Sequence, residues 1–334
     1  MPVVVGTLQE DAASAPPGAA TAIGRRRHEP ARAECLEIGI LNNMPDQALV
    51  ATERQFVDLL GAAAGKMLVR LRFFSLPEVP RGDAAKAHVQ TAYGDAGELV
   101  ARPLDGLIVT GNEPHAARLP DEPYWESFTN VIDWAEHNTT STIFSCLAAH
   151  AAVLHLDGVT RHPLDAKRCG VFDCAKVSDS PLLAGVPAPL RITHSRWNDL
   201  KEAELAAHGY RVLTRSAQAG VDMFMKRWRS LFVFFQGHPE YERDSLMREY
   251  RRDVSRFVRG EREVYPDLPQ GYFDPRSEEA LAIFGARARS ARDPALLSVF
   301  PDDLALRPSL AGKWGASATP LLRNWLAHLA AHQR

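Results

Sequence analysis

The stretch TSTIFSCLAAHAAVLHL, residues 140–156, decides the fold, because an apolar run passes into an Ala-rich segment without an intervening turn. Residues 140–146 have the β-branched and aromatic composition of a buried strand. The alanines and leucines that follow, in residues 147–156, favour a helix. A strand that leads directly into a helix is half of a crossover unit, which joins neighbouring strands of a parallel sheet.

The same alternation extends in both directions along the chain. After residue 170 the pattern turns to successive strands, consistent with an antiparallel extension of the sheet. We therefore predict an α/β fold with a doubly wound, mostly parallel sheet that is flanked by helices. Strands are predicted in 35–45, 67–74, 104–114, 140–146, 168–177, 210–216, 221–227 and 230–237, and helices in 51–65, 122–138, 147–156 and 243–261.

Three parts of the chain differ in composition. Residues 1–33 are rich in Ala, Gly and Pro, bury too little apolar surface to offset the entropy of ordering, and are predicted to be a flexible tail. Residues 34–262 are predicted to form the main domain. Residues 263–334 combine Pro-rich irregular sequence with a closing amphipathic helix, and we expect this extension to pack on the main domain.

The overall composition excludes several classes of protein. The 334 residues are 46% hydrophobic and 24% charged, with a formal net charge of −2, so we expect neither a nucleic-acid partner nor attraction to an anionic membrane. The apolar runs are too short to span a bilayer, and the N-terminus lacks the order of a signal peptide. Four cysteines without paired spacing favour a reducing compartment, and we expect the protein to be cytoplasmic.

Cys146 stands where the predicted strand meets the helix. Backbone N–H groups and the positive end of a helix dipole favour a thiolate there, which would make Cys146 a nucleophile. A buried, inert cysteine is the structural alternative.

The segment FVFFQGHPEYER, residues 232–243, places His238 and Glu240 on either side of Pro239 at the end of an apolar strand. Restricted geometry around the proline predicts that both side chains point the same way, so that the carboxylate orients the imidazole as a base for a thiol. The alternative is a solvent-exposed turn with a weak ion pair. A zinc site is less well supported, because no nearby Cys or His cluster completes four ligands.

Several motifs occur together in one order. They are IGILNNMP (38–45), DGLIVTG (105–111), YW (124–125), GVF (170–172), HSR (194–196), GHPEY (237–241) and EYRRD (249–253). In this order and spacing the sequence resembles the homoserine O-acyltransferase family of methionine biosynthesis, of the homoserine O-succinyltransferase type, which has a class I glutamine amidotransferase-like fold. The resemblance covers residues 36 to 258.

The resemblance implies roles for particular residues. Cys146 would form an acyl-thioester, with His238 as proton acceptor and Glu240 as its partner. Substrate contacts are implied at Lys167, Ser195 and Arg252, where the arginine could clamp an α-carboxylate.

The implied reaction moves an acyl group from acyl-CoA to the hydroxyl of L-homoserine. Its oxyanions need donors, for which the N–H of Leu147 and a backbone N–H near Gly111 are candidates. No metal or prosthetic group is implied, acyl-CoA being a co-substrate, and a homodimer is usual for the family.

Some residues depart from the family pattern. His115 stands where relatives carry a Gly with succinyl transfer or a Glu with acetyl transfer. Neither rule applies directly: a protonated His115 would favour a succinyl carboxylate, but an unperturbed histidine is mostly neutral at pH 7. Of the two acyl groups, succinyl is predicted in preference to acetyl. Leu147 and His150 replace a typical Trp and Gln, and a serine acceptor would also fit these changes. His150 is predicted to be a hydrogen-bonded core histidine rather than a polar contact of the pocket.

Two further functions use the same fold. A glutaminase would use the same three residues on a glutamine amide, and a non-catalytic binding protein would use none of them.

Overall fold

The computed structural model describes residues 3–6, 35–302 and 315–333. The chain divides into two compact units. Unit 1 comprises Met1–Ala152, Arg227–Val233 and Trp325–Arg334, and unit 2 comprises Val153–Lys226 and Phe234–Asn324.

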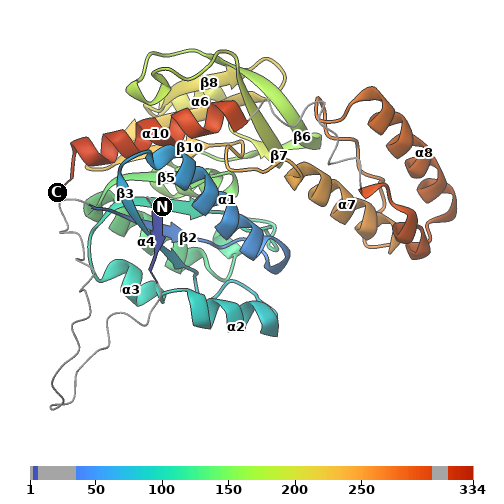
Figure 1. Ribbon diagram of the computed structural model, residues 1–334, viewed down its shortest axis with the longest axis horizontal. Helices are drawn as coiled ribbons and strands as arrows, with labels where there is room; N and C mark the ends of the chain where they lie inside the picture. Colours follow the sequence, from blue (N-terminus) through green and yellow to red (C-terminus); the bar gives the residue numbers. More distant parts are fainter. Residues whose placement is uncertain (1–2, 7–34, 303–314, 334) are drawn as a thin grey trace, which may run out of the picture. The chain divides into compact units, whose positions relative to one another are not determined.

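Unit 1 contains a parallel sheet (Figure 1). Its strands follow the order β1-β3-β2-β4-β5, with parallel pairing throughout, and the next strand, β10, passes from unit 1 into unit 2. Reversal of the order between β3 and β4 is the arrangement of a doubly wound sheet, so the predicted fold class is confirmed. The strands are β1 (Val3–Val5), β2 (Cys35–Leu41), β3 (Leu68–Phe74), β4 (Leu104–Thr110), β5 (Thr139–Ser145) and β10 (Leu231–Phe235).

Helices connect these strands. They are α1 (Asp46–Ala64), α2 (Asp83–Ala92), α3 (Ala96–Val100) and α4 (Trp125–Asn138), with η2 (Leu119–Asp121), a single 3₁₀ turn, before α4. Sequence analysis predicted α1 and α4 but not α2 and α3. Strand β1 falls within the tail predicted for residues 1–33; the rest of that tail, apart from Gly6, lies outside the described residues.

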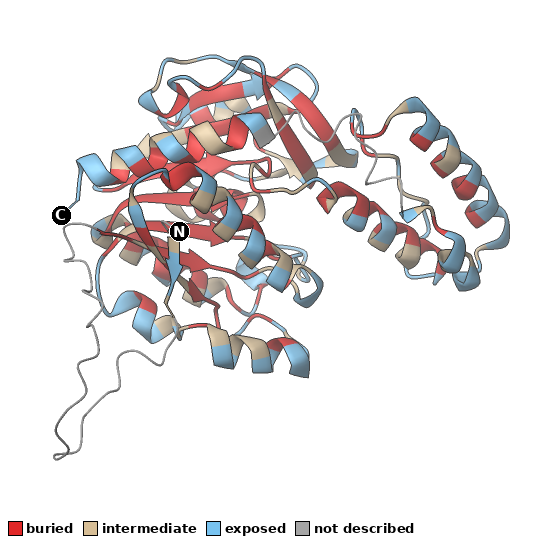
Figure 2. Cartoon of the chain, in the orientation of Figure 1, coloured by how far each residue is buried: buried red, intermediate tan, exposed pale blue. Residues whose placement is uncertain are grey.

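The core of unit 1 surrounds β5, which is buried at all seven positions (Figure 2). Helix α10 (Gly315–Ala331) contributes Trp325, whose indole Nε1 donates to the Ser141 Oγ at 2.9 Å. A Cβ at Gly106 on β4 would lie 2.7 Å from both Trp325 and Leu329, so only glycine leaves room for this helix. The end of the predicted C-terminal extension is therefore part of the core of unit 1.

Unit 2 contains antiparallel pairs, as predicted for the second half of the chain. Strand β6 pairs with β7 and β8, and β8 pairs with β9. The strands are β6 (His162–Lys176), β7 (Leu190–Asp199), β8 (Arg211–Ser216) and β9 (Gly220–Arg227); α5 (Leu147–Asp157) leads into the unit, and η3 (Pro181–Leu183) and α6 (Glu202–Ala207) lie in its connections. Sequence analysis did not predict β7.

A second core in unit 2 lies along α7 (Ser245–Val258), which falls within the helix predicted for residues 243–261. Helix α8 (Pro275–Ala291) and the turn η4 (Pro294–Val299) belong to the region predicted to be irregular. Pro275 occupies the first turn of α8, where its missing N–H costs nothing, and Asp274 caps the helix. Within the described part of the chain, no helix combines the length and the apolar character needed to cross a bilayer.

Candidate active site

Cys146 lies at the junction of β5 and α5, as predicted, and its backbone has a φ of 52°. An L-residue rarely adopts this left-handed conformation, which costs about 1–2 kcal/mol. The backbone N–H groups of Ala149 and His150 donate to the Cys146 carbonyl at 3.0 and 3.3 Å, which closes the turn that starts the helix. A strained strand-to-helix turn is the geometry that presents a nucleophile in hydrolases of the α/β type.

Gly111, at the end of β4, packs directly on the start of α5. A Cβ at Gly111 would lie 2.5 Å from the Leu147 Cβ and 3.0 Å from the Ala148 nitrogen. The first N–H groups of a helix have no partner within the helix, so this is a place where backbone donors can converge. The structure thus brings together the two candidate oxyanion donors, Leu147 and Gly111.

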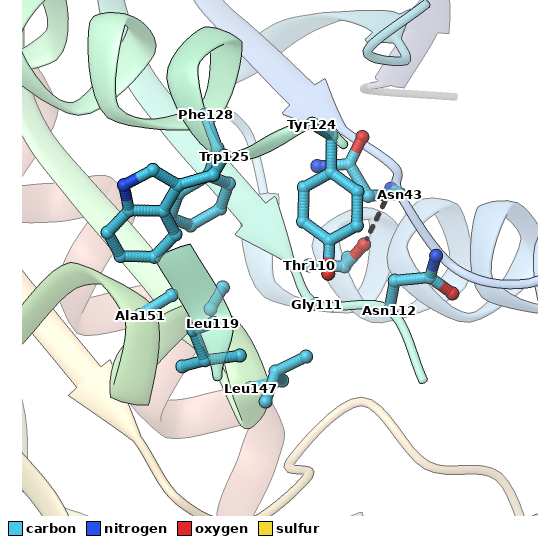
Figure 3. Close-up of a pocket in the computed structure, with 11 residues that line it drawn as sticks. Asn43, Thr110, Gly111, Asn112, Leu119, Tyr124, Trp125, Phe128, Leu147 and Ala151 are labelled. Atoms are coloured by element: carbon cyan, nitrogen blue, oxygen red, sulfur yellow. Dashed lines mark hydrogen bonds between the residues drawn. The ribbon is translucent and has the colours of Figure 1, made fainter. Parts of the chain in front are cut away.

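A pocket in unit 1 adjoins the same helix start. Figure 3 shows aromatic side chains from the start of α4 opposite Leu147 and Ala151 of α5. Most of its lining residues are apolar. The lining residues are Asn43, Thr110, Gly111, Asn112, Leu119, Tyr124, Trp125, Phe128, Leu147, Ala148 and Ala151.

His115 does not line this pocket, and it is exposed. Its backbone N–H and that of Ala116 both donate to the buried Glu122 Oε1 at 2.7 Å, so Glu122 holds the loop that carries His115. A role of His115 in donor selectivity stays a prediction. His150 is 2% exposed, which agrees with the predicted core histidine.

His238 and Glu240 form a buried pair in unit 2. The His238 Nδ1 and Glu240 Oε1 lie 2.9 Å apart, and the two residues are 6% and 7% exposed. The alternative of a solvent-exposed turn is therefore wrong. A backbone bridge to β7 anchors the segment, because the His238 N–H donates to the Thr193 carbonyl at 2.7 Å and the Thr193 hydroxyl donates to the His238 carbonyl.

The residues implied by the family resemblance for substrate contact come together in unit 2, around a carboxylate that sequence analysis missed. We call this group the Glu249 cluster; it consists of Lys167 on β6, Ser195 on β7, and Glu249, Arg252 and Asp253 on α7. The Lys167 Nζ lies 3.2 Å from the Glu249 Oε2 and 2.8 Å from the Asp253 Oδ2. Ser195 donates to the same Glu249 oxygen, and Arg252 lies 3.2 Å from the Asp253 Oδ1.

The charged groups of the Glu249 cluster shift one another's pKa values. Burial disfavours the Glu249 carboxylate, but Lys167, Arg252 and the hydroxyls that donate to it outweigh burial and lower its pKa to about 2. Burial also opposes the charge on Lys167, whose pKa is nevertheless raised by Glu249, Cys169 and Asp253. The pattern that could have revealed Glu249 is its position three residues before Arg252, on one face of the predicted helix.

Another buried group in unit 2 contains Cys174, His194 and Asp222, whose ligand atoms lie within 4.8 Å of one another. The Arg196 Nε donates to the His194 Nδ1 at 3.4 Å, so in the neutral ring the proton is on Nε2, which faces the Asp222 Oδ1 at 3.4 Å. Burial lowers the pKa of His194 and keeps the ring neutral. An Nε2 that carries a proton has no lone pair for a metal. Although Nε2 faces Asp222, neither the His194 Nε2 nor the Asp222 Oδ1 has a hydrogen-bond partner in the described part of the chain.

Together these features define a class: an α/β protein with a cysteine on a strained strand-to-helix turn and a buried His–Glu pair. The family model described as homoserine O-succinyltransferase matches residues 18–334, and the chain belongs to this family. A homoserine O-succinyltransferase of Rhodopseudomonas palustris is 53% identical over 300 residues, covering 90% of each chain. One of Methylorubrum extorquens is 51% identical over 292 residues, covering 87% of this chain and 86% of its own.

A solved structure of a glutamine amidotransferase from Methylobacillus flagellatus also aligns with the chain. It has 13% sequence identity and a TM-score of 0.48, and the alignment covers 88% of this chain and 95% of that one.

Proposed function

We propose that the protein transfers a succinyl group from succinyl-CoA to the hydroxyl of L-homoserine, through a thioester on Cys146. Membership of the family supports the substrates. The observation that carries the chemistry is the strained turn at Cys146, because a φ of 52° costs free energy that a purely structural cysteine would not need.

In the first half-reaction the Cys146 thiolate attacks the thioester carbonyl of the donor. A new bond forms between Sγ and the acyl carbon, the bond from that carbon to the CoA sulfur breaks, and CoA leaves as its thiol with the proton of the His238 imidazolium, which becomes the neutral base of the next step. One thioester replaces another, so little free energy is lost. The N–H groups near Leu147 and Gly111 would stabilise the oxyanion, a contribution of roughly 3 kcal/mol for each well-aimed donor.

In the second half-reaction His238 accepts the proton of the homoserine hydroxyl as its oxygen attacks the acyl carbon. An oxygen ester forms and the bond to Sγ breaks, which restores the thiolate. Glu240 orients the imidazole through Nδ1, which leaves Nε2 for the proton. The ester is more stable than the thioester, so this step drives the reaction forward.

The Glu249 cluster suits an acceptor that is an amino acid. Lys167, Arg252 and the nearby Arg262 surround the carboxylates of Glu249 and Asp253 with positive charge. Arg252 is 30% exposed and can present a planar fork to an α-carboxylate. We therefore propose that Lys167, Ser195 and Arg252 form the acceptor side, and that His115 influences the choice of acyl group.

Intact-protein mass spectrometry tests the proposal. The protein should gain one succinyl unit on mixing with succinyl-CoA and lose it when L-homoserine is added, whereas a Cys146→Ala variant should gain nothing. More rapid labelling by acetyl-CoA would show that acetyl-CoA is the donor. Discharge by L-serine rather than homoserine would show that L-serine is the acceptor. Labelling by a glutamine analogue alone would show a glutaminase instead.

A further inference from the structure

Tyr241 connects the two functional groups of unit 2, the His238–Glu240 pair and the Glu249 cluster. Its ring stacks on the His238 imidazole, with the centroids 4.1 Å apart and the planes at 20°. Its hydroxyl donates to the Glu249 Oε1. One side chain therefore contacts both the proposed base and the carboxylate at the centre of the proposed acceptor side.

The local sequence explains this position. Pro239 follows His238 and favours a turn, and the Tyr241 N–H donates to the His238 carbonyl at 3.3 Å. Such a turn returns residue 241 to the side of residue 238, so the two rings can meet face to face. The stack is thus built into the spacing of the His-Pro-Glu-Tyr segment.

The stack restrains the plane of the His238 ring. The bridge to Thr193 fixes the backbone of His238, and Glu240 holds Nδ1 at 2.9 Å. A ring held at one atom can still swing about that contact, and a flat neighbour on its face opposes the swing. A proton acceptor must stay close to its ideal direction to work, because small misplacements are costly in rate.

The hydroxyl of Tyr241 in turn depends on Glu249. Because the pKa of Glu249 is lowered to about 2, the carboxylate stays ionised at neutral pH and remains an acceptor for this hydroxyl. The same carboxylate binds Ser195 and Lys167. Any acceptor that contacts these groups will therefore change the hydrogen bonds that hold Tyr241.

We infer that Tyr241 is a positioning residue that couples occupation of the Glu249 cluster to the orientation of the His238 ring. This inference rests on the proposed function. Its consequence is an asymmetry between the half-reactions: loss of the hydroxyl weakens the step that needs the acceptor more than the step that needs only the donor.

The test measures the two half-reactions separately by rapid mixing and mass spectrometry, in three variants of the full chain. Tyr241→Phe keeps the ring and loses the hydroxyl, and should slow discharge by homoserine about 10-fold while acylation changes less than about 3-fold. Tyr241→Leu loses the stack and should slow both steps. Tyr272→Phe is the matched control, because it also removes a buried tyrosine hydroxyl in unit 2, one that donates to the Arg243 carbonyl, and it should change neither rate.

The outcomes separate the inference from the proposed function. If the wild-type protein is not acylated, or homoserine does not discharge it, the proposed function fails. If the wild-type protein performs both steps but Tyr241→Phe slows them equally, or slows neither, the coupling through the hydroxyl is refuted. If Tyr241→Leu does not fold, as judged by circular dichroism, Tyr241→Phe still decides, since its kcat/KM for homoserine must fall about 10-fold while its kcat/KM for the donor changes less than about 3-fold.

Discussion

The left-handed backbone at Cys146 predicts an inverted order of stability between two small substitutions. Both Cys146→Ala and Cys146→Gly remove the thiol, so they differ only in the Cβ and in the freedom of the backbone. At the φ of 52° found here, an L-residue pays about 1–2 kcal/mol that glycine does not. Glycine loses more entropy on folding, by roughly 0.5–1 kcal/mol. We therefore expect Cys146→Gly to be more stable than Cys146→Ala by about 0.5–1 kcal/mol.

Urea denaturation followed by circular dichroism measures this difference, provided that the two variants unfold with equal slopes. The control is Ala149→Gly, one turn into α5, where the backbone is helical and glycine should be destabilising by about 1 kcal/mol. Both substitutions at Cys146 should abolish acylation. If the alanine variant is as stable as the glycine variant or more so, Cys146 is not strained, and the argument for a presented nucleophile fails.

Two other predictions concern unit 2. In Gly237→Ala the new Cβ would lie 2.8 Å from the Thr193 carbonyl, so the segment that carries His238 must shift. We expect kcat in a steady-state assay to fall roughly 10-fold or more. The control is Gly61→Ala, which should keep full activity because the space around Gly61 is open. Glu249 has a folded-state pKa of about 2, below the ordinary 4.5, so its stabilisation is complete above about pH 5 and is lost as the pH falls towards 2. Urea titrations should show this loss, on the order of 3 kcal/mol, in the wild type and not in Glu249→Gln; parallel curves for the two proteins would contradict it.

Sequence analysis missed strand β7 because polar residues stand at some of its inward positions. Strand β7 alternates correctly, but two of its inward positions are the polar His194 and Arg196, at 0% and 4% exposure. His194 faces Asp222 on β9, and Arg196 donates to the Ala219 carbonyl, which precedes β9, as well as to Asp199 at the end of β7. No local pattern of hydrophobicity can show that a histidine and an arginine face inward, because their burial depends on partners that only the fold supplies.

The candidate site shows the same limit. Cys146, His238 and Glu240 were identifiable because strand ends and a proline constrain them locally. The positive φ at Cys146 and the central position of Glu249 were not, because the first is a backbone conformation imposed by the β5–α5 junction and the second requires three separate elements to meet. Family resemblance supplied Lys167, Ser195 and Arg252, but not the carboxylate that joins them.

The two units hold different parts of the proposed chemistry, and this division has a consequence for specificity. The nucleophile, the candidate oxyanion donors and the apolar pocket all belong to unit 1, whereas the His–Glu pair and the Glu249 cluster belong to unit 2. In the proposed reaction the groups of unit 1 bind the acyl chain, and the groups of unit 2 bind the amino acid. Substitutions in the pocket should therefore change the preference among acyl donors but not the preference among acceptors. Substitutions in the Glu249 cluster should change the preference among acceptors but not among donors, because sites without shared partners contribute nearly additively.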